Sequence, residues 1–186
     1  WGLGHDNYDT PPEWNLYDLI INLENYDKTD WLPNLSTCKA VKFLWSIDAH
    51  TRGLEPYLQI FNNHKYDLIL QATPEYLTDK SVWLPNAFDD TLIKPLDINK
   101  EHYIGFCGNY VNRKEYIDFI DRVIEVKRDI FVIGDAMVRS INSYKIHFNK
   151  NISNDINYRN FETIGCNTTL LTNYNEHHNK LGFRDG

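Results

Sequence analysis

The sequence predicts an α/β protein built from two parallel β-sheets. Short apolar runs of strand length alternate with stretches of helical periodicity along most of the 186 residues. Strands of this kind belong in parallel sheets whose faces are covered by helices. One polar stretch, from about Asp89 to His102 and containing Pro95, interrupts the alternation. We therefore predict two α/β lobes, residues 1–95 and residues 96–186.

The first half opens with a predicted loop, because residues 1–14 are rich in Gly, Pro and Asp. Apolar runs bounded by polar residues then predict strands at 17–23, 40–47, 66–71 and 81–84. Helical spacing predicts a helix at 54–63 and a short helix at 74–77.

In the second half, the same patterns predict strands at 103–108, 130–134, 145–149 and 169–172. Helices are predicted at 112–127, 136–142 and 155–166, the last with Asp155 near its start. The first of these helices has five apolar residues on one face: Tyr116, Phe119, Ile120, Val123 and Ile124. Neither half holds the usual number of strands, so we expect both lobes to be incomplete.

Composition argues against several classes of protein. An apolar share of 42% with 14% aromatic residues argues against disorder. The formal net charge of -7, with no run of Lys and Arg, argues against nucleic acid as a partner. The sequence shows no apolar stretch of membrane-spanning length and no recognisable signal peptide, so we expect a cytoplasmic protein.

Metal and cofactor sites are not expected. Cys38, Cys107 and Cys166 are too widely spaced for a disulfide framework or a paired zinc motif. Asp89-Asp90 could suggest an acidic metal-binding pair, but Asp after a Pro-Asn turn is commonly a turn or cap residue.

A strand that runs into a glycine turn and then a helix is the first candidate site. Gly105-Phe-Cys-Gly108-Asn109 is followed by Arg113-Lys114. Backbone N–H groups in such a turn can approach a phosphate closely, and the helix dipole favours the anion. The basic pair could neutralise a diphosphate. A plain turn with solvated cations is an equal alternative, and the missing third glycine argues against an NAD enzyme.

The helix predicted from Asp155 carries the second candidate site. Asp155, Arg159 and Glu162 recur at spacings of four and three, which places them on one helix face. Asn157 and the free N–H groups of the first turn point at whatever precedes the helix. A carboxylate on a helix aimed at a nucleotide can accept both ribose hydroxyls. Spacing alone favours the plainer alternative, charge pairs on a solvated face.

Five segments carry a resemblance to known enzymes, in matching order from about Lys42 onward. Residues 84–89 (LPNAFD), with Lys94-Pro95, match an I-P-N-G-V-D…F-x-P signature, and residues 70–77 match an S-E-Y-L step. Residues 104–109 match a second-lobe opening strand. Residues 142–149 and 155–172 match an A-K-I-x-L-N…D-I-N-x-R-x-F-E-x-x-G-x-G…L-L-T stretch. The set resembles group 1 glycosyltransferases of the GT-B fold, the last two segments their CgeB-like (spore maturation protein-like) group.

This resemblance implies two Rossmann-like lobes of the GT-B type, with a nucleoside-diphosphate sugar held mainly by the second lobe and the acceptor facing the first. Glu162 would grip the ribose, and residues 145–149 would pass beside the base. His50 matches an active-site histidine, which could bond a sugar hydroxyl or shuttle a proton; a loop histidine bonded to backbone is the alternative. The predicted donor-binding residues are Gly108, Asn109, Arg113, Lys114, Lys145, Asn149, Asp155, Asn157, Arg159 and Glu162.

Three positions depart from the family pattern. Asn154 stands where many related transferases have a Glu eight positions before the ribose-binding Glu, and Ala87 and Asn167 replace glycines. These departures leave open which carboxylate would stabilise a developing oxocarbenium ion.

We therefore expect a glycosyltransferase that moves a sugar from a nucleoside-diphosphate sugar to an unknown acceptor (a glycan, a protein or a small molecule) without a metal. A non-catalytic nucleotide-sugar-binding or assembly module is the alternative, because fold does not fix function. A Rossmann-type oxidoreductase is disfavoured by the absent dinucleotide fingerprint.

Overall fold

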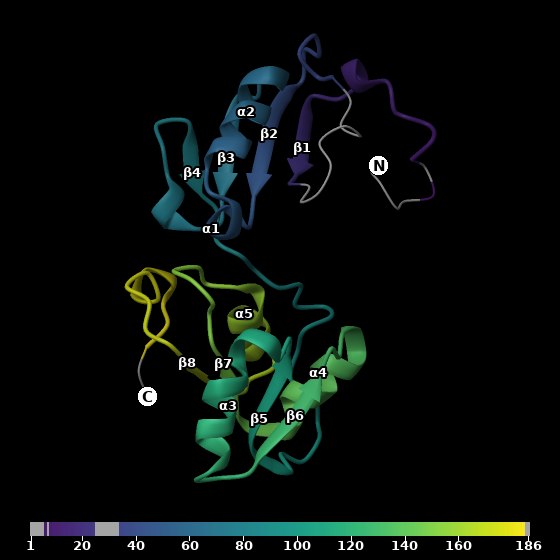
Figure 1. Cartoon of the computed structure of the whole chain (residues 1–186). Coiled ribbons are helices and arrows are strands. Elements are labelled where there is room, and N and C mark those ends of the chain that lie inside the picture. Colours follow the sequence, from purple (N-terminus) through teal and green to yellow (C-terminus); the bar gives the residue numbers. More distant parts are fainter. Residues whose placement is uncertain (1–5, 7, 25–33, 185–186) are drawn as a thin grey trace. The chain divides into compact units, whose positions relative to one another are not determined.

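The computed structural model describes residue 6, residues 8–24 and residues 34–184. The chain divides into two compact units, Trp1–Pro85 and Asn86–Gly186, and each contains one parallel sheet (Figure 1). The predicted fold class is confirmed, because each unit is a Rossmann-like arrangement of parallel strands flanked by helices.

The first unit places its four described strands in sequential order, β1-β2-β3-β4. The strands are β1 (Leu19–Leu23), β2 (Val41–Ser46), β3 (Leu68–Gln71) and β4 (Ser81–Trp83). The helices are α1 (Ala49–Arg52) and α2 (Glu55–His64), with 3-10 turns at Trp14–Leu16 and Pro74–Tyr76. The predicted N-terminal loop is confirmed at residues 6 and 8–13, whereas residues 1–5 and 7 lie outside the described part.

The core of the first unit lies between the sheet and α2, which crosses β2 and β3 in Figure 1. Leu44 and Ile69 on the sheet pack against Tyr57 and Phe61 of the helix. The opposite face of the sheet is also apolar, as expected for the apolar strands of a parallel sheet. Within the described residues this second face stays open, since five of its side chains are 45–52% exposed: Leu19, Ile21, Leu23, Val41 and Val82.

The second unit has the strand order β6-β5-β7-β8, again entirely parallel. Its strands are β5 (His102–Gly108), β6 (Val126–Ile130), β7 (Tyr144–Asn149) and β8 (Thr169–Thr172). Its helices are α3 (Lys114–Asp121), α4 (Gly134–Ser143) and α5 (Tyr158–Gly165), with 3-10 turns at Val111–Arg113 and Asn179–Leu181. One core forms around Ile117 of α3, and a second around Ile141 of α4.

One helix and one strand of the second unit, α3 and β6, differ from their predicted bounds. Helix α3 ends at Asp121 rather than 127, and its buried side is centred on Ile117, whereas Phe119 and Val123 are 66% and 84% exposed. The strand predicted at 130–134 runs instead from Val126 to Ile130. The charged run Lys127-Arg128-Asp129 does not have the apolar pattern by which strands were predicted. An edge strand can carry such charges when they form ion pairs, as Lys127 does with Asp129 and Arg128 with Asp121.

The segment between the predicted lobes belongs to the second unit. The Asn86 side chain donates to the carbonyl of Ile156 at 3.0 Å. Asn142 of α4 is 3% exposed, donates to the Lys94 carbonyl at 3.1 Å and accepts from the Leu96 N–H at 2.8 Å. The unit boundary therefore lies at Pro85, ten residues before the predicted division at 95/96. Polar composition suggested a linker, but backbone groups of Lys94 and Leu96 bond to Asn142 of α4, and the Asn86 side chain bonds to the chain just before α5.

Close packing fixes the same segment against α5. A Cβ at Gly165 would approach Phe88 to 2.7 Å and Ile93 to 2.9 Å, so any other residue there would force these side chains to shift. Lys100 completes the attachment by donating to the Tyr144 carbonyl and the Thr168 hydroxyl, both at 2.9 Å. The packing makes residues 86–100 a structural part of the second unit.

Replacing Asn142 by Leu should lower the free energy of unfolding of the second unit by about 2 kcal/mol or more, because the Lys94 carbonyl and Leu96 N–H lose their buried partner. Urea denaturation followed by circular dichroism measures the change. Asn112→Leu, at an exposed position, is the matched control and should change stability by less than about 0.5 kcal/mol. Equal stability of the two variants would contradict the assigned role of Asn142.

Candidate functional site

The carboxyl ends of β5 and β7 form the topological switch point of the second sheet. From β5 the chain passes through α3 to β6 on one side, while β7 lies on the other side. The β5–β7 register extends to Gly105 opposite His147. Beyond that pair the Cys107 N–H is bonded by the His147 side chain at 3.1 Å. Open α/β sheets bind ligands at such a point, outside the carboxyl ends of the strands.

His147 is a buried wedge between these two strands. Its Nε2 accepts from the Cys107 N–H, so Nδ1 carries the hydrogen and donates to the Thr163 hydroxyl at 2.6 Å. Thr163 in turn donates to the Arg159 carbonyl at 2.5 Å. Burial lowers the pKa of His147 to about 3, and the nearby Arg159 charge adds to the effect. The sequence placed this residue only within the stretch 145–149 expected beside the base and gave it no role of its own; a histidine inside an apolar strand pattern was its only signal.

An asparagine network holds the start of α5 beside the end of β7. Asn157 caps the helix by accepting from the Arg159 N–H. The Asn149 side chain donates to Asn157 and to Asn160, both at 3.0 Å, and Asn160 donates to Asn151 at 2.8 Å. Asn149, Asn151 and Asn160 are at most 3% exposed. The predicted residues Asn149 and Asn157 are thus brought together, with two partners that sequence analysis did not single out.

The sequence predicted that Asp155 shares a helix face with Arg159 and Glu162, and this prediction is wrong. The helix begins at Tyr158 with Asn157 as its cap, so Asp155 lies in the preceding loop, where it is 7% exposed. Asn157 is in the extended conformation typical of a cap, which excludes the preceding residues from the helix. Burial lowers the pKa of Arg113, and the nearby charge of Asp155 opposes part of this shift.

The predicted basic pair is divided between two environments. Arg113 bridges the two loops of the switch point, because its Nε donates to the Lys150 carbonyl at 2.9 Å and its Nη1 to the Asn109 carbonyl at 3.3 Å. Lys114 is exposed and pairs with Asp118 one turn along α3. Arg113 therefore lies at the switch point together with Gly108 and Asn109. Lys114 is instead paired with the carboxylate of Asp118 on α3.

Arg159 and Glu162 form an ion pair on α5, with Nη1 and Oε2 2.8 Å apart and side chains about one-fifth exposed, 19% and 21%. Burial raises the pKa of Glu162, and the Arg159 charge opposes this shift. Both charges also act on the thiol of Cys107, the residue before Gly108. The pair therefore lies near the glycine turn and is largely sheltered from solvent.

Lys145 is not part of this cluster. It is the second residue of β7, and its ammonium lies 5.7 Å from the centre of the Tyr103 ring, near the amino ends of the strands. Asn149 lies four positions further along the strand, at a distance of about 13 Å.

His50 lies in the first unit, in the short helix α1 directly after β2. Its Nε2 is 3.8 Å from Asp48, and its side chain is 9% exposed. Within the described residues its Nδ1 is buried without a hydrogen-bond partner. Glu24, which sequence analysis missed, follows β1 and accepts from the backbone N–H groups of Ile47 and Asp48. The carboxyl edge of this sheet thus gathers two carboxylates and a histidine, and burial raises the pKa of both Glu24 and Asp48.

The second unit matches the model of a known protein family. The family model described as glycosyl transferase-like matches residues 91–186, which cover almost all of the second unit. The chain belongs to the glycosyl transferase-like family. Among curated proteins, no sequence matches it. Family membership supports glycosyl transfer as the general activity, and it agrees with the coarse part of the resemblance read from the sequence.

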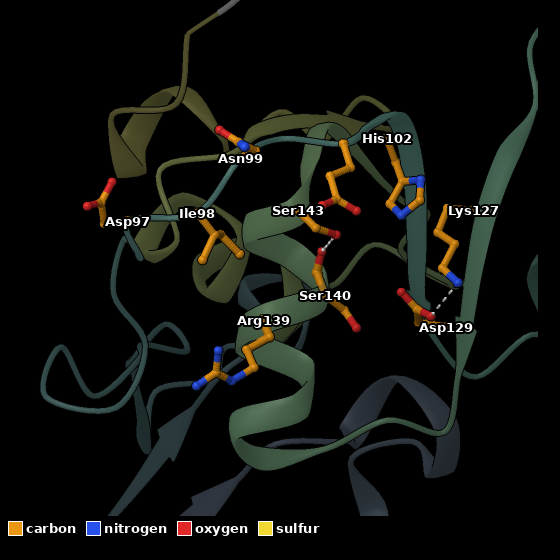
Figure 2. A pocket seen from close by; sticks show the side chains of 10 residues that line it. Asp97, Ile98, Asn99, His102, Lys127, Asp129, Arg139, Ser140 and Ser143 are labelled. Carbon is orange, nitrogen blue, oxygen red and sulfur yellow. Dashed lines mark hydrogen bonds and ion pairs between the residues drawn. The ribbon is translucent and has the colours of Figure 1, made fainter.

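In this glycosyl transferase-like chain, a hollow of about 640 Å³ lies away from the switch point. Figure 2 shows His102 and the Lys127–Asp129 pair on the strands, with Arg139 of α4 pointing away from that pair. Since His102 and Lys127 stand at or near the amino ends of β5 and β6, the hollow opens on the side opposite to the expected ligand edge.

No group of three or more His, Cys, Asp or Glu side chains suited to a metal ion occurs in the described part of the glycosyl transferase-like chain. Asp89 accepts from the Thr91 N–H at 2.8 Å and from its hydroxyl at 2.6 Å, and these bonds lower the pKa of Asp89. The predicted turn role of Asp89 is confirmed. No helix between residues 34 and 184, or in the described part before them, is long and apolar enough to cross a membrane.

The buried neutral His147 predicts a pH dependence of stability. In the unfolded chain the His147 side chain takes up a proton below about pH 6.5, whereas in the folded chain it stays neutral down to about pH 3. The free energy of unfolding should therefore fall as the pH drops from about 6.5 to about 3. The full contribution of one such group is about 1.4 kcal/mol per pH unit. Urea denaturation between pH 7 and pH 4 should show a slope shallower by this amount in His147→Gln. Parallel slopes in the two proteins would contradict a neutral His147.

Proposed function

We propose that the chain transfers a sugar from a nucleoside-diphosphate sugar to an acceptor without a metal, and that the second unit holds the donor. The observation that carries this proposal is the convergence of the Gly108 turn, Arg113 and the first turn of α5 at the switch point of the family-matched unit. A closer kinship with the CgeB-like group stays a prediction from the sequence.

The diphosphate of the donor would lie over the turn after β5. Gly108 has φ +157°, a conformation that residues with a side chain rarely adopt, and a Cβ there would meet only Phe106, at 3.5 Å. The turn is therefore open to a ligand, and its backbone N–H groups could face an anion. Arg113 would supply the positive charge that stabilises the leaving diphosphate, with Lys114 in a secondary role because Asp118 already holds it.

The ribose would lie against Glu162. A carboxylate has two oxygens, so one can hold Arg159 while the other accepts from ribose hydroxyls. Burial raises the pKa of Glu162 and the Arg159 charge opposes this shift, so the ion pair favours the ionised carboxylate, which accepts more strongly than a neutral acid. Asn157 and Asn149 would act indirectly by fixing the helix that carries this pair.

His50 would contribute on the sugar side of the reaction. Its Nδ1 has no described hydrogen-bond partner, so it could bond a hydroxyl or exchange a proton with it. Asp48 stands on the Nε2 side of the ring and could orient it.

Glu162→Gln tests the donor site. The variant keeps the shape of the side chain but removes its charge, so UDP or GDP should bind about 5- to 150-fold more weakly, as expected for the loss of about 1–3 kcal/mol of charged hydrogen bonding. Isothermal titration calorimetry measures the affinity, with the exposed Glu125→Gln as control. Unchanged affinity would remove the ribose role. Donor binding with no hydrolysis or transfer would favour a binding module instead of an enzyme.

The two basic residues should differ in their effect. Arg113→Gln should weaken inorganic pyrophosphate and nucleoside diphosphates alike, by about tenfold, and should leave the affinity for the nucleoside unchanged. Lys114→Gln should change the same affinities less than about threefold, because this side chain is exposed and already paired. Equal losses in the two variants, in the same calorimetric titrations, would contradict the division between them.

A further inference from the structure

Phe131 stands in an unusual position at the end of β6. It follows the last strand residue directly, with φ +58°, a left-handed backbone conformation that is strained for a bulky side chain. Its side chain is nevertheless 71% exposed, so no burial of the ring compensates the strain. Strained backbone that is not explained by packing is concentrated at ligand-binding positions.

The backbone of Phe131 is attached to the glycine turn. Its N–H donates to the carbonyl of Gly108 at 3.3 Å. Val132, the next residue, packs into the core around α4, whereas Ile133 is 79% exposed. The loop is therefore anchored at its centre and directs Phe131 outward beside Gly108.

The same loop leads to the ion pair on α5. Helix α4 begins at Gly134, directly after the loop, and its Met137 is contacted at the sulfur by Nη1 of Arg159. Arg159 is the partner of Glu162. Phe131 thus belongs to a loop that adjoins both the turn proposed for the diphosphate and the carboxylate proposed for the ribose. The base of a nucleotide is attached to that ribose, so it must lie within a few ångströms of it.

We propose that Phe131 stacks on the nucleobase of the donor, an inference that rests on the proposed function of this unit. A nucleobase offers a flat π face to an exposed aromatic ring, and such stacking accepts any base. Phe131 would therefore contribute affinity for a nucleoside diphosphate without selecting the base, and the choice among bases would depend on other residues.

Calorimetric titration of Phe131→Ala, with Phe119→Ala as control, tests this assignment. Phe119 is an exposed phenylalanine of α3 in the same unit. With the nucleoside diphosphate that binds the natural protein best (from UDP, GDP, ADP and dTDP), Phe131→Ala should bind about 5- to 150-fold more weakly. Phe131→Trp should retain the affinity, and inorganic pyrophosphate should bind all variants equally.

Phe131→Gly adds a test that does not depend on the alanine variant folding. Glycine adopts φ +58° without strain, so this variant should be at least as heat-stable as the natural protein and should still lose nucleotide affinity. A purely structural Phe131 would show the reverse pattern, lower stability with unchanged affinity.

The remaining outcomes separate the two proposals. If the natural protein binds none of the nucleotides, the proposed donor site fails and this inference fails with it. If Glu162→Gln weakens nucleotide binding while Phe131→Ala and Phe131→Gly leave it unchanged, the stacking role alone is wrong. Weaker binding of a nucleotide sugar with unchanged binding of its nucleoside diphosphate would place the ring on the sugar and overturn the assignment to the base.

Discussion

The separation of β5 from β7 is the constraint on which the second unit depends. Parallel strands would normally continue their ladder, but the His147 ring takes the Cys107 N–H in place of a main-chain carbonyl. The ring must stay neutral to accept that bond, and burial keeps it so. Because the wedge is also tied through Thr163 to Arg159, the opening of the sheet and the position of α5 are fixed together.

Neutral amides surround this opening, and charges are few. A buried amide network satisfies loop backbone and side chains without adding net charge, which would be costly away from water. Asn149, Asn157 and Asn160 therefore hold the helix start, while the charged groups at its border, Arg113 and the Arg159–Glu162 pair, are held by backbone carbonyls and by each other. A frame of this kind would keep the residues that we propose for donor binding in place before a ligand arrives, and such positioning and electrostatic stabilisation contribute to group transfer.

Most elements could be predicted from the sequence, because apolar periodicity reports which residues face a core. β8 is found at 169–172 as predicted, and β5 and β7 each begin one residue early. β6 was misplaced by four residues, since its charges resemble a loop until their partners on α3 are known. The buried face of α3 was wrong for a related reason: apolar residues occur on two sides of that helix, and only the sheet selects Ile117.

The fold class, the glycine turn and the residues near the start of α5 could be predicted from the amino-acid sequence, because each follows from local spacing and chain order. Which of these residues come into contact depends on the packing of the folded chain. It moved Asp155 off the helix, separated Lys145 from Asn149 by the length of a strand, and gave Arg113 and Lys114 different partners. It also brought in His147, Glu24 and Phe131, whose surroundings come from residues distant in the chain. Contacts of that kind depend on how elements pack, which local periodicity does not encode.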